Sequence, residues 1–141
     1  MTMRQAQHRL SIATPGRGLV EITSPVVCWA EAQGMAAGLL TLFCQHTSAS
    51  LLIQENADPD VRADLEAYFA TIAPEAPGRY IHDAEGPDDM PAHIRAALGQ
   101  TQIAIPLTDR RLALGTWQGI YLFEHRRAPH RRSVVLHLLG E

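Results

Sequence analysis

The chain has 141 residues, the usual length of one domain and enough to bury a single hydrophobic core. Hydrophobic residues make up 46% and charged residues 19%, which excludes the composition of a disordered chain. The net charge of −3 argues against non-specific nucleic-acid binding, and no apolar run approaches the roughly 18 residues of a membrane span. We expect one domain over residues 1–141, with no nucleic acid and no membrane as partner.

The cysteines and the N-terminus bear on the cellular compartment. Cys28 and Cys44 match neither a disulfide framework nor a Cys-x-x-Cys motif, so we predict two free thiols. The polar segment 1–10 lacks the apolar stretch of a signal peptide. Both features favour a cytoplasmic protein.

The first third of the chain alternates between strand and helix patterns. Ser24 and Pro25 predict the N-cap and first position of a helix over 25–33. A period of two predicts strands at 4–12, 19–23, 38–46 and 48–54. In the third of these strands one face carries Leu40, Leu42, Cys44 and His46. The ring of His46 should therefore point into the core or into a pocket.

Two further helices are expected after this segment. Asp58 caps the first and Pro59 takes its first position, followed by an apolar stripe of Val61, Leu65, Tyr68 and Phe69. The segment 73–86 reads as a loop. A shorter helix over 89–98 follows, with Gly99 as its stop and with Met90, Ile94 and Leu98 facing inward.

The remaining sequence is typical of strands, at 102–107, 111–114, 116–125 and 132–139. The last strand is apolar on both faces, so it needs cover from a second sheet or from a neighbouring subunit. The whole pattern predicts an α+β fold in which antiparallel sheets pack as a sandwich with two to three helices.

Four blocks of sequence resemble the YjbQ-like family, in order and over essentially the whole chain. They are the segments 46–50, 54–59, 80–94 and 114–126. The resemblance implies a compact α+β fold, assembly as a homotrimer and a weak thiamine phosphate synthase activity. That activity couples a pyrimidine pyrophosphate to a thiazole phosphate.

Candidate site residues fall within these blocks. His46 is followed by Thr47, Ser48 and Ser50, whose hydroxyls suit a phosphate group or, alternatively, satisfy a tight bend. His82 suits a metal ligand or a general acid or base, and Asp83 suits an orienting group or a magnesium ligand. The acidic pair at 88 and 89 also offers a helix N-cap.

His125 completes a set of three histidines. If His46, His82 and His125 converged, they would form an open zinc site of the catalytic type. His8, His93 and His137 are less favoured as ligands, with His93 expected on a helix surface. No His-Glu-x-x-His or Cys-x-x-Cys motif supports a metal from spacing alone.

The final block contributes an aromatic and several polar groups. Trp117 either stacks on a ligand or belongs to the core or an interface, and Gln118 suits a hydrogen bond to a ligand across a subunit boundary. The stretch 125–132 reads as a basic hairpin turn. It is either a solvated loop or the source of one arginine, Arg126 or Arg132, that grips phosphate.

These residues support three functional hypotheses. In a synthase, His46, Ser48, Ser50 and Arg126 would bind the anion, Asp83 would hold magnesium, and His82 and His125 would handle protons or a metal. The alternatives are a non-catalytic trimer that binds a metal or a small phosphorylated metabolite, and a zinc-dependent hydrolase. A divalent metal is the expected cofactor, and no organic cofactor is implied.

Overall fold

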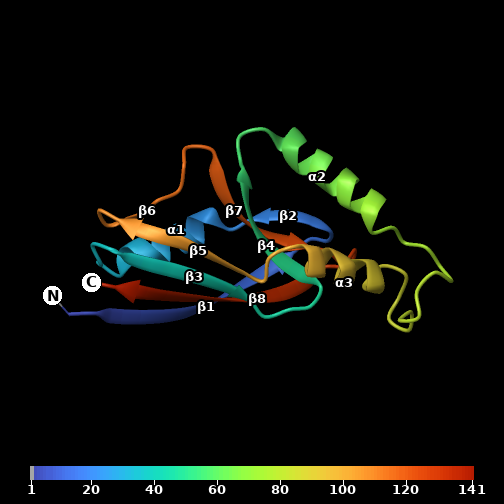
Figure 1. Ribbon diagram of the computed structural model, residues 1–141, viewed down its shortest axis with the longest axis horizontal. Helices are drawn as coiled ribbons and strands as arrows, with labels where there is room; N and C mark the ends of the chain where they lie inside the picture. Colours follow the sequence, from blue (N-terminus) through green and yellow to red (C-terminus); the bar gives the residue numbers. More distant parts are fainter. Residues whose placement is uncertain (1) are drawn as a thin grey trace.

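The computed structural model describes residues 2–141, which form two antiparallel sheets and three helices (Figure 1). The larger sheet has the strand order β1 (Arg4–Thr14), β8 (His130–Gly140), β3 (Gly38–Cys44), β5 (Gln102–Thr108) and β6 (Arg111–Leu112). The smaller sheet has the order β2 (Gly18–Glu21), β7 (Gln118–Glu124) and β4 (Ala49–Glu55). The predicted α+β fold with antiparallel sheets is confirmed.

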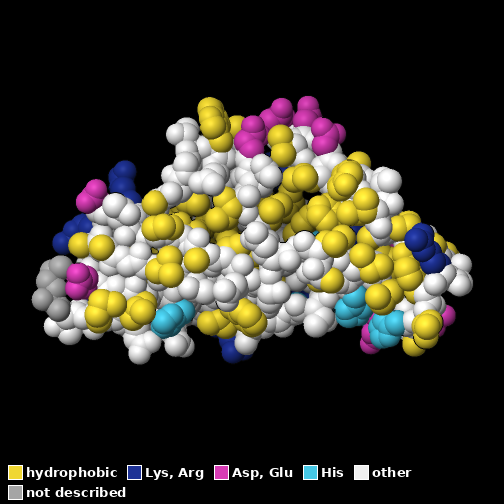
Figure 2. Space-filling model, viewed as in Figure 1, with side chains coloured by type: hydrophobic (Ala, Val, Ile, Leu, Met, Phe, Trp, Pro, Cys, Tyr) yellow, Lys and Arg dark blue, Asp and Glu magenta, His cyan; other side chains and the backbone are white. Residues whose placement is uncertain are grey.

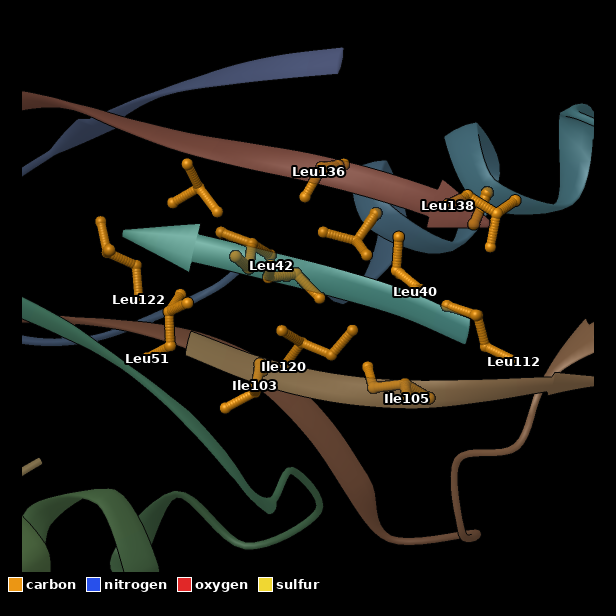
Figure 3. Packing of buried hydrophobic residues seen from close by; sticks show 14 of the residues in the cluster. Leu40, Leu42, Leu51, Ile103, Ile105, Leu112, Ile120, Leu122, Leu136 and Leu138 are labelled. Atoms are coloured by element: carbon orange, nitrogen blue, oxygen red, sulfur yellow. The ribbon is translucent and has the colours of Figure 1, made fainter. Parts of the chain in front are cut away.

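The core lies where the inner faces of the two sheets meet (Figure 3). Leu40 and Leu42 of β3 are fully buried, as the period of two predicted. Leu136 and Leu138 of β8 pair with them in register. Leu51 and Ile120 meet this layer from the smaller sheet.

Helix α1 (Thr23–Ala32) begins two residues before the predicted start. Ser24 therefore lies inside the helix, and its expected role as N-cap is wrong. The reason is local: the Thr23 hydroxyl accepts a hydrogen bond from the Ile120 amide, which ties the first helical residue to β7. Val26 and Ala30 are buried, so this face of the helix belongs to the core.

Helix α2 (Pro59–Ile72) starts as predicted, with the Asp58 side chain accepting a hydrogen bond from the Asp60 amide. No residue of α2 is buried, however, and Tyr68 of its apolar stripe is 62% exposed. Figure 2 shows exposed apolar side chains between α2 and the strands below it. The stripe thus has only partial cover within one chain.

Helix α3 (Asp89–Leu98) has the predicted bounds but the opposite inner face. Asp89, Pro91, Ala92 and Arg95 are buried, while Leu98 is 61% exposed. The expected inward position of Leu98 is therefore wrong, and Met90 and Ile94 are only half-buried. Ion pairs made by Asp89 and Arg95 explain this, because a paired charge can replace an apolar residue inside the molecule.

The segment between β7 and β8 passes from one sheet to the other. β7 pairs with β2 and β4, whereas β8 pairs with β1 and β3, so the predicted hairpin turn over 125–132 is wrong. The crossing places the residues after β7 and those at the start of β8 at the same end of the molecule.

The outer face of the larger sheet carries several apolar side chains that no other part of the described chain covers. Leu39 and Phe43 of β3 and Leu139 of β8 are 47%, 45% and 44% exposed. Within residues 2–141, no helix is both long and apolar enough to cross a membrane.

Candidate functional site

An open pocket of about 890 Å³ lies beside the end of β3. Its walls include the loop that joins β3 to β4, one face of α3 and the start of β8. The polar side chains that line it are those of Gln45, His46, Thr47, Ser48, His93, Thr101 and Arg132.

Backbone and side-chain contacts fix the ring of His46 in this pocket. Its Nε2 atom accepts a hydrogen bond of 2.8 Å from the Ser133 amide, and its Nδ1 atom lies 3.4 Å from Nη1 of Arg132. Partial burial, together with the nearby positive charge of Arg132, lowers the pKa of His46. The ring is therefore neutral near pH 7.

Arg132 is held in place by a buried carboxylate. Glu124 is fully buried and accepts hydrogen bonds from Nε and Nη2 of Arg132 and from the Thr14 hydroxyl. Burial disfavours the charged form of Glu124, but these bonds outweigh it and lower its pKa. Nη2 of Arg132 also donates to the Ser48 hydroxyl oxygen at 3.0 Å.

A second polar cluster adjoins the pocket through His93. Oδ2 of Asp89 lies 2.8 Å from Nε2 of His82 and 3.4 Å from Nε2 of His93. Ligand atoms of these three residues all fall within 4.8 Å of one another, the only such group of three or more His, Cys, Asp or Glu side chains across residues 2–141.

Arg126 holds the other side of this cluster. Its Nη1 atom donates to Oδ1 of Asp89 at 2.9 Å, and its Nε atom donates to Asp88 at 3.0 Å. Burial opposes ionisation of Asp89, yet hydrogen bonding to His82 and the charge of Arg126 lower its pKa overall. Asp88 occupies the N-cap position of α3 but bonds Arg126 and the Arg127 amide with its side chain.

His125 lies inside the protein. It is 1% exposed, and its Nε2 atom is 2.9 Å from the hydroxyl of Ser50, which is 2% exposed. Burial and the nearby charge of Arg95 lower the pKa of His125 to about 3. This pair therefore belongs to the interior and not to the pocket.

The chain was compared with known protein families and with known proteins. Residues 8–141 match the model of the family described as UPF0047 protein YjbQ-like. The chain belongs to this family. A UPF0047 protein of Synechocystis is 53% identical over 140 residues, which cover 99% of this chain and 95% of that protein. The YjbQ protein of Escherichia coli O157:H7 is 41% identical over 136 residues, covering 96% and 98%.

Solved structures of YjbQ-like proteins share the fold. A YjbQ/UPF0047 protein of Clostridium acetobutylicum superposes with a TM-score of 0.85 at 35% identity, covering 93% of this chain and 98% of that one. A protein of Sulfolobus solfataricus gives a TM-score of 0.90 at 22% identity, covering 99% of this chain and 100% of its own. The second likeness concerns the fold alone.

The YjbQ-like fold separates the three histidines predicted to share a metal. His46 lines the pocket, His82 belongs to the Asp89 cluster, and His125 is buried against Ser50. The carboxylate next to His82 is that of Asp89, so Asp83 does not orient this ring. Asp83 is exposed and lines a separate small pocket.

Other predicted ligand-binding residues are also redistributed. Thr47 and Ser48 line the pocket, whereas the Ser50 hydroxyl is committed to His125. Trp117 is 62% exposed and stands outside the pocket lining, so its placement in the core is wrong. Gln118 accepts a hydrogen bond from the Gly115 amide at 2.7 Å and closes its own loop.

Sequence reasoning missed Asp89 and His93 as candidate ligands. A usable signal was present: the two residues are four apart on one helix, which places them on the same helical face. Of the two arginines considered for phosphate, Arg126 is bound by two carboxylates, and Arg132 is the one that lines the pocket.

Proposed function

We propose that the chain binds a divalent metal ion, with zinc as the first choice, through His82, Asp89 and His93. We further propose that it acts with this ion on a small phosphorylated metabolite in the adjoining pocket. The observation that carries the proposal is the convergence of both imidazole Nε2 atoms on one carboxylate oxygen, beside the pocket that His93 lines.

The donor set fits such an ion. Two imidazole nitrogens and one carboxylate are the protein ligands of many catalytic zinc and non-haem iron sites, which keep a position open for water or substrate. Zn–N bonds of about 2.0–2.1 Å place neighbouring ligand atoms roughly 3.3 Å apart. The observed 2.8 and 3.4 Å separations need only a small widening around Asp89.

Residues around the cluster would support this role. Arg126 holds Oδ1 of Asp89, which leaves Oδ2 directed at the two histidines. Outer contacts of this kind orient metal ligands and tune their charge. When bound, a divalent ion would supply Lewis-acid polarisation of a phosphate oxygen or a water molecule.

Two reactions deserve assay with the metal-loaded protein. Thiamine phosphate formation, implied by the family resemblance, stays a prediction; displacement of pyrophosphate needs a cation, which the cluster would provide. Hydrolysis of a phosphate ester is the alternative, favoured by the two-histidine, one-carboxylate donor set. If neither occurs although metal and phosphate bind, the chain is a binding module of the cytoplasm, where its free thiols would stay reduced.

Metal content measured by mass spectrometry tests the proposal. We expect about one ion per chain after supplying zinc to the wild type, and strong loss in His82→Ala and His93→Ala. His8→Ala serves as a matched control because His8 stacks on Trp29, away from the cluster. A wild type that takes up no ion, or variants that keep it, would reject the site. An equal loss in His46→Ala would also contradict the site, because His46 lies in the pocket and outside the cluster.

We also propose that the protein forms a homotrimer. The exposed apolar outer face of β3 and β8 supports association, because extended apolar patches on a folded chain mark interaction surfaces. Helix α2, which has no buried residue in one chain, offers a second surface for a neighbouring copy.

A further inference from the structure

The hydrogen bonds of His46 determine which of its ring nitrogens carries the proton. Nε2 accepts from the Ser133 amide, so it cannot itself hold a hydrogen. A neutral imidazole has one N–H, and that hydrogen must then be on Nδ1. His46 is thus a donor toward Arg132.

Arg132 presents a second donor at the same point. Its Nε and Nη2 atoms donate hydrogen bonds to Glu124 and Ser48. Among residues 2–141, its Nη1 atom has one neighbour within hydrogen-bond range, which is Nδ1 of His46 at 3.4 Å. A guanidinium nitrogen always carries hydrogens and never accepts. Two donors therefore face each other at the pocket wall with no acceptor between them.

We infer that His46 Nδ1 and Arg132 Nη1 together bind an oxygen atom of an anionic group, phosphate or carboxylate, on a small metabolite. We call this pair of atoms the oxyanion clamp. It is a built site, since Arg132 is 5% exposed and fixed by a fully buried carboxylate. The Ser48 hydroxyl, which accepts from Arg132, has its own hydrogen free to donate to a further oxygen.

The oxyanion clamp has almost no net charge of its own. Glu124 offsets the charge of Arg132, and His46 is neutral, so the clamp itself has almost no net charge. It therefore recognises oxygen through directed N–H groups. Tight binding of a dianion would need the positive charge of the ion proposed at His82, Asp89 and His93. In this respect alone the inference rests on the proposed function.

Nitrogen-15 NMR of the full chain, freed of metal and dialysed, tests the clamp without the metal site. We expect to find His46 as the Nδ1–H tautomer. We also expect its Nδ1 resonance to shift on titration with at least one of two anions, inorganic phosphate or acetate, each added separately. The more effective anion identifies the group. An Nε2–H tautomer, or no shift with either anion, would overturn the inference even if the protein binds zinc.

Variants locate the binding. His46→Gln and Arg132→Lys should each weaken affinity for the effective anion at least about ten-fold, since each removes one charge-assisted or directed hydrogen bond. The matched controls His8→Gln and Arg131→Lys should bind as the wild type does, because Arg131 bonds Ser11 on the other face of β8. Equal affinity in all four variants would place the anion elsewhere.

Discussion

At the scale of single residues, the interior of this protein holds more ionisable groups than a small domain usually buries. Glu124 and Arg95 are 0% and 1% exposed, and His125 is 1% exposed. The two charges are paired, whereas His125 stays neutral. Its Nδ1 atom has no hydrogen-bond partner among residues 2–141.

The neutral His125 makes stability depend on pH. An unfolded imidazole titrates near pH 6.5 and the folded one at about 3, so below pH 6.5 the unfolded state gains a proton that the folded state lacks. The free energy of unfolding should therefore fall with decreasing pH, by up to about 1.4 kcal/mol per unit between pH 6.5 and 4.5.

Urea unfolding at pH 7, 6 and 5 measures this slope. His125→Gln, which can keep a hydrogen bond to Ser50, should show a clearly smaller slope than the wild type. Any contribution of His46 is common to both proteins. Carboxylates with lowered pKa, such as Glu124, lose their contribution only as the pH falls below about 4.5. Identical slopes would mean that His125 is not neutral in the folded protein.

At the scale of elements, α2 depends on few contacts. None of its residues is buried, and its Glu66 carboxylate binds Nη1 of the buried Arg95 in α3 with both oxygens, at 3.0 and 2.8 Å. Phe69 adds an edge-to-face contact with Phe123 of β7. The ion pair thus joins two helices across the loop that contains His82.

Removal of one partner of this ion pair should lower the free energy of unfolding more than removal of both partners. Glu66→Ala leaves the Arg95 charge buried and unpaired, and we expect a loss of about 2–3 kcal/mol in urea unfolding, because Glu66 is itself partly exposed. The double variant Glu66→Ala/Arg95→Met should recover most of this loss. Glu75→Ala, which removes a partly exposed carboxylate from Arg17 and Arg127, is the control. A single variant no worse than this control would contradict the prediction.

The same pair shows how far the sequence predicts elements and site. Local patterns suffice for β3, where every second residue is apolar, and for the start of α2, where Asp58 and Pro59 are adjacent. They fail for α3, because Arg95 is buried by a partner that is 29 residues away. A window of one helix cannot reveal that partner.

Site residues follow the same rule. His46, Thr47 and Ser48 were predicted together and lie together in the pocket because they are consecutive. His82 lies next to His93 and not next to His125 because of the path that the chain takes between β4 and α3. Spacing along the sequence does not contain that information.

At the scale of the whole molecule, the outer face of β3 and β8 exposes the apolar side chains of Leu39, Phe43 and Leu139. Phe43 belongs both to this face and to the pocket lining, so an interface formed here would border the candidate site. Association and ligand binding would then share a boundary.

Sedimentation equilibrium tests the trimer. We expect a mass three times that of the 15.5 kDa chain, and a shift toward the single-chain mass in Leu39→Glu and Leu139→Glu, which place charges on the apolar face. Leu98→Glu changes a leucine on α3 that is 61% exposed, and it should leave the mass unchanged. A wild type that sediments as a single chain would refute the trimer.

The three candidate metal ligands all lie within residues 82–93, whereas the oxyanion clamp joins His46 to Arg132. A ribosome completes the first segment before it makes β7 and β8, and closing so short a loop costs little entropy. The growing chain would therefore present all three proposed ligands before the anion pocket exists, and Arg126, which holds Asp89, would join them only after β7 is made. Translation order would make metal uptake an early step of biogenesis and metabolite binding a property of the finished protein alone.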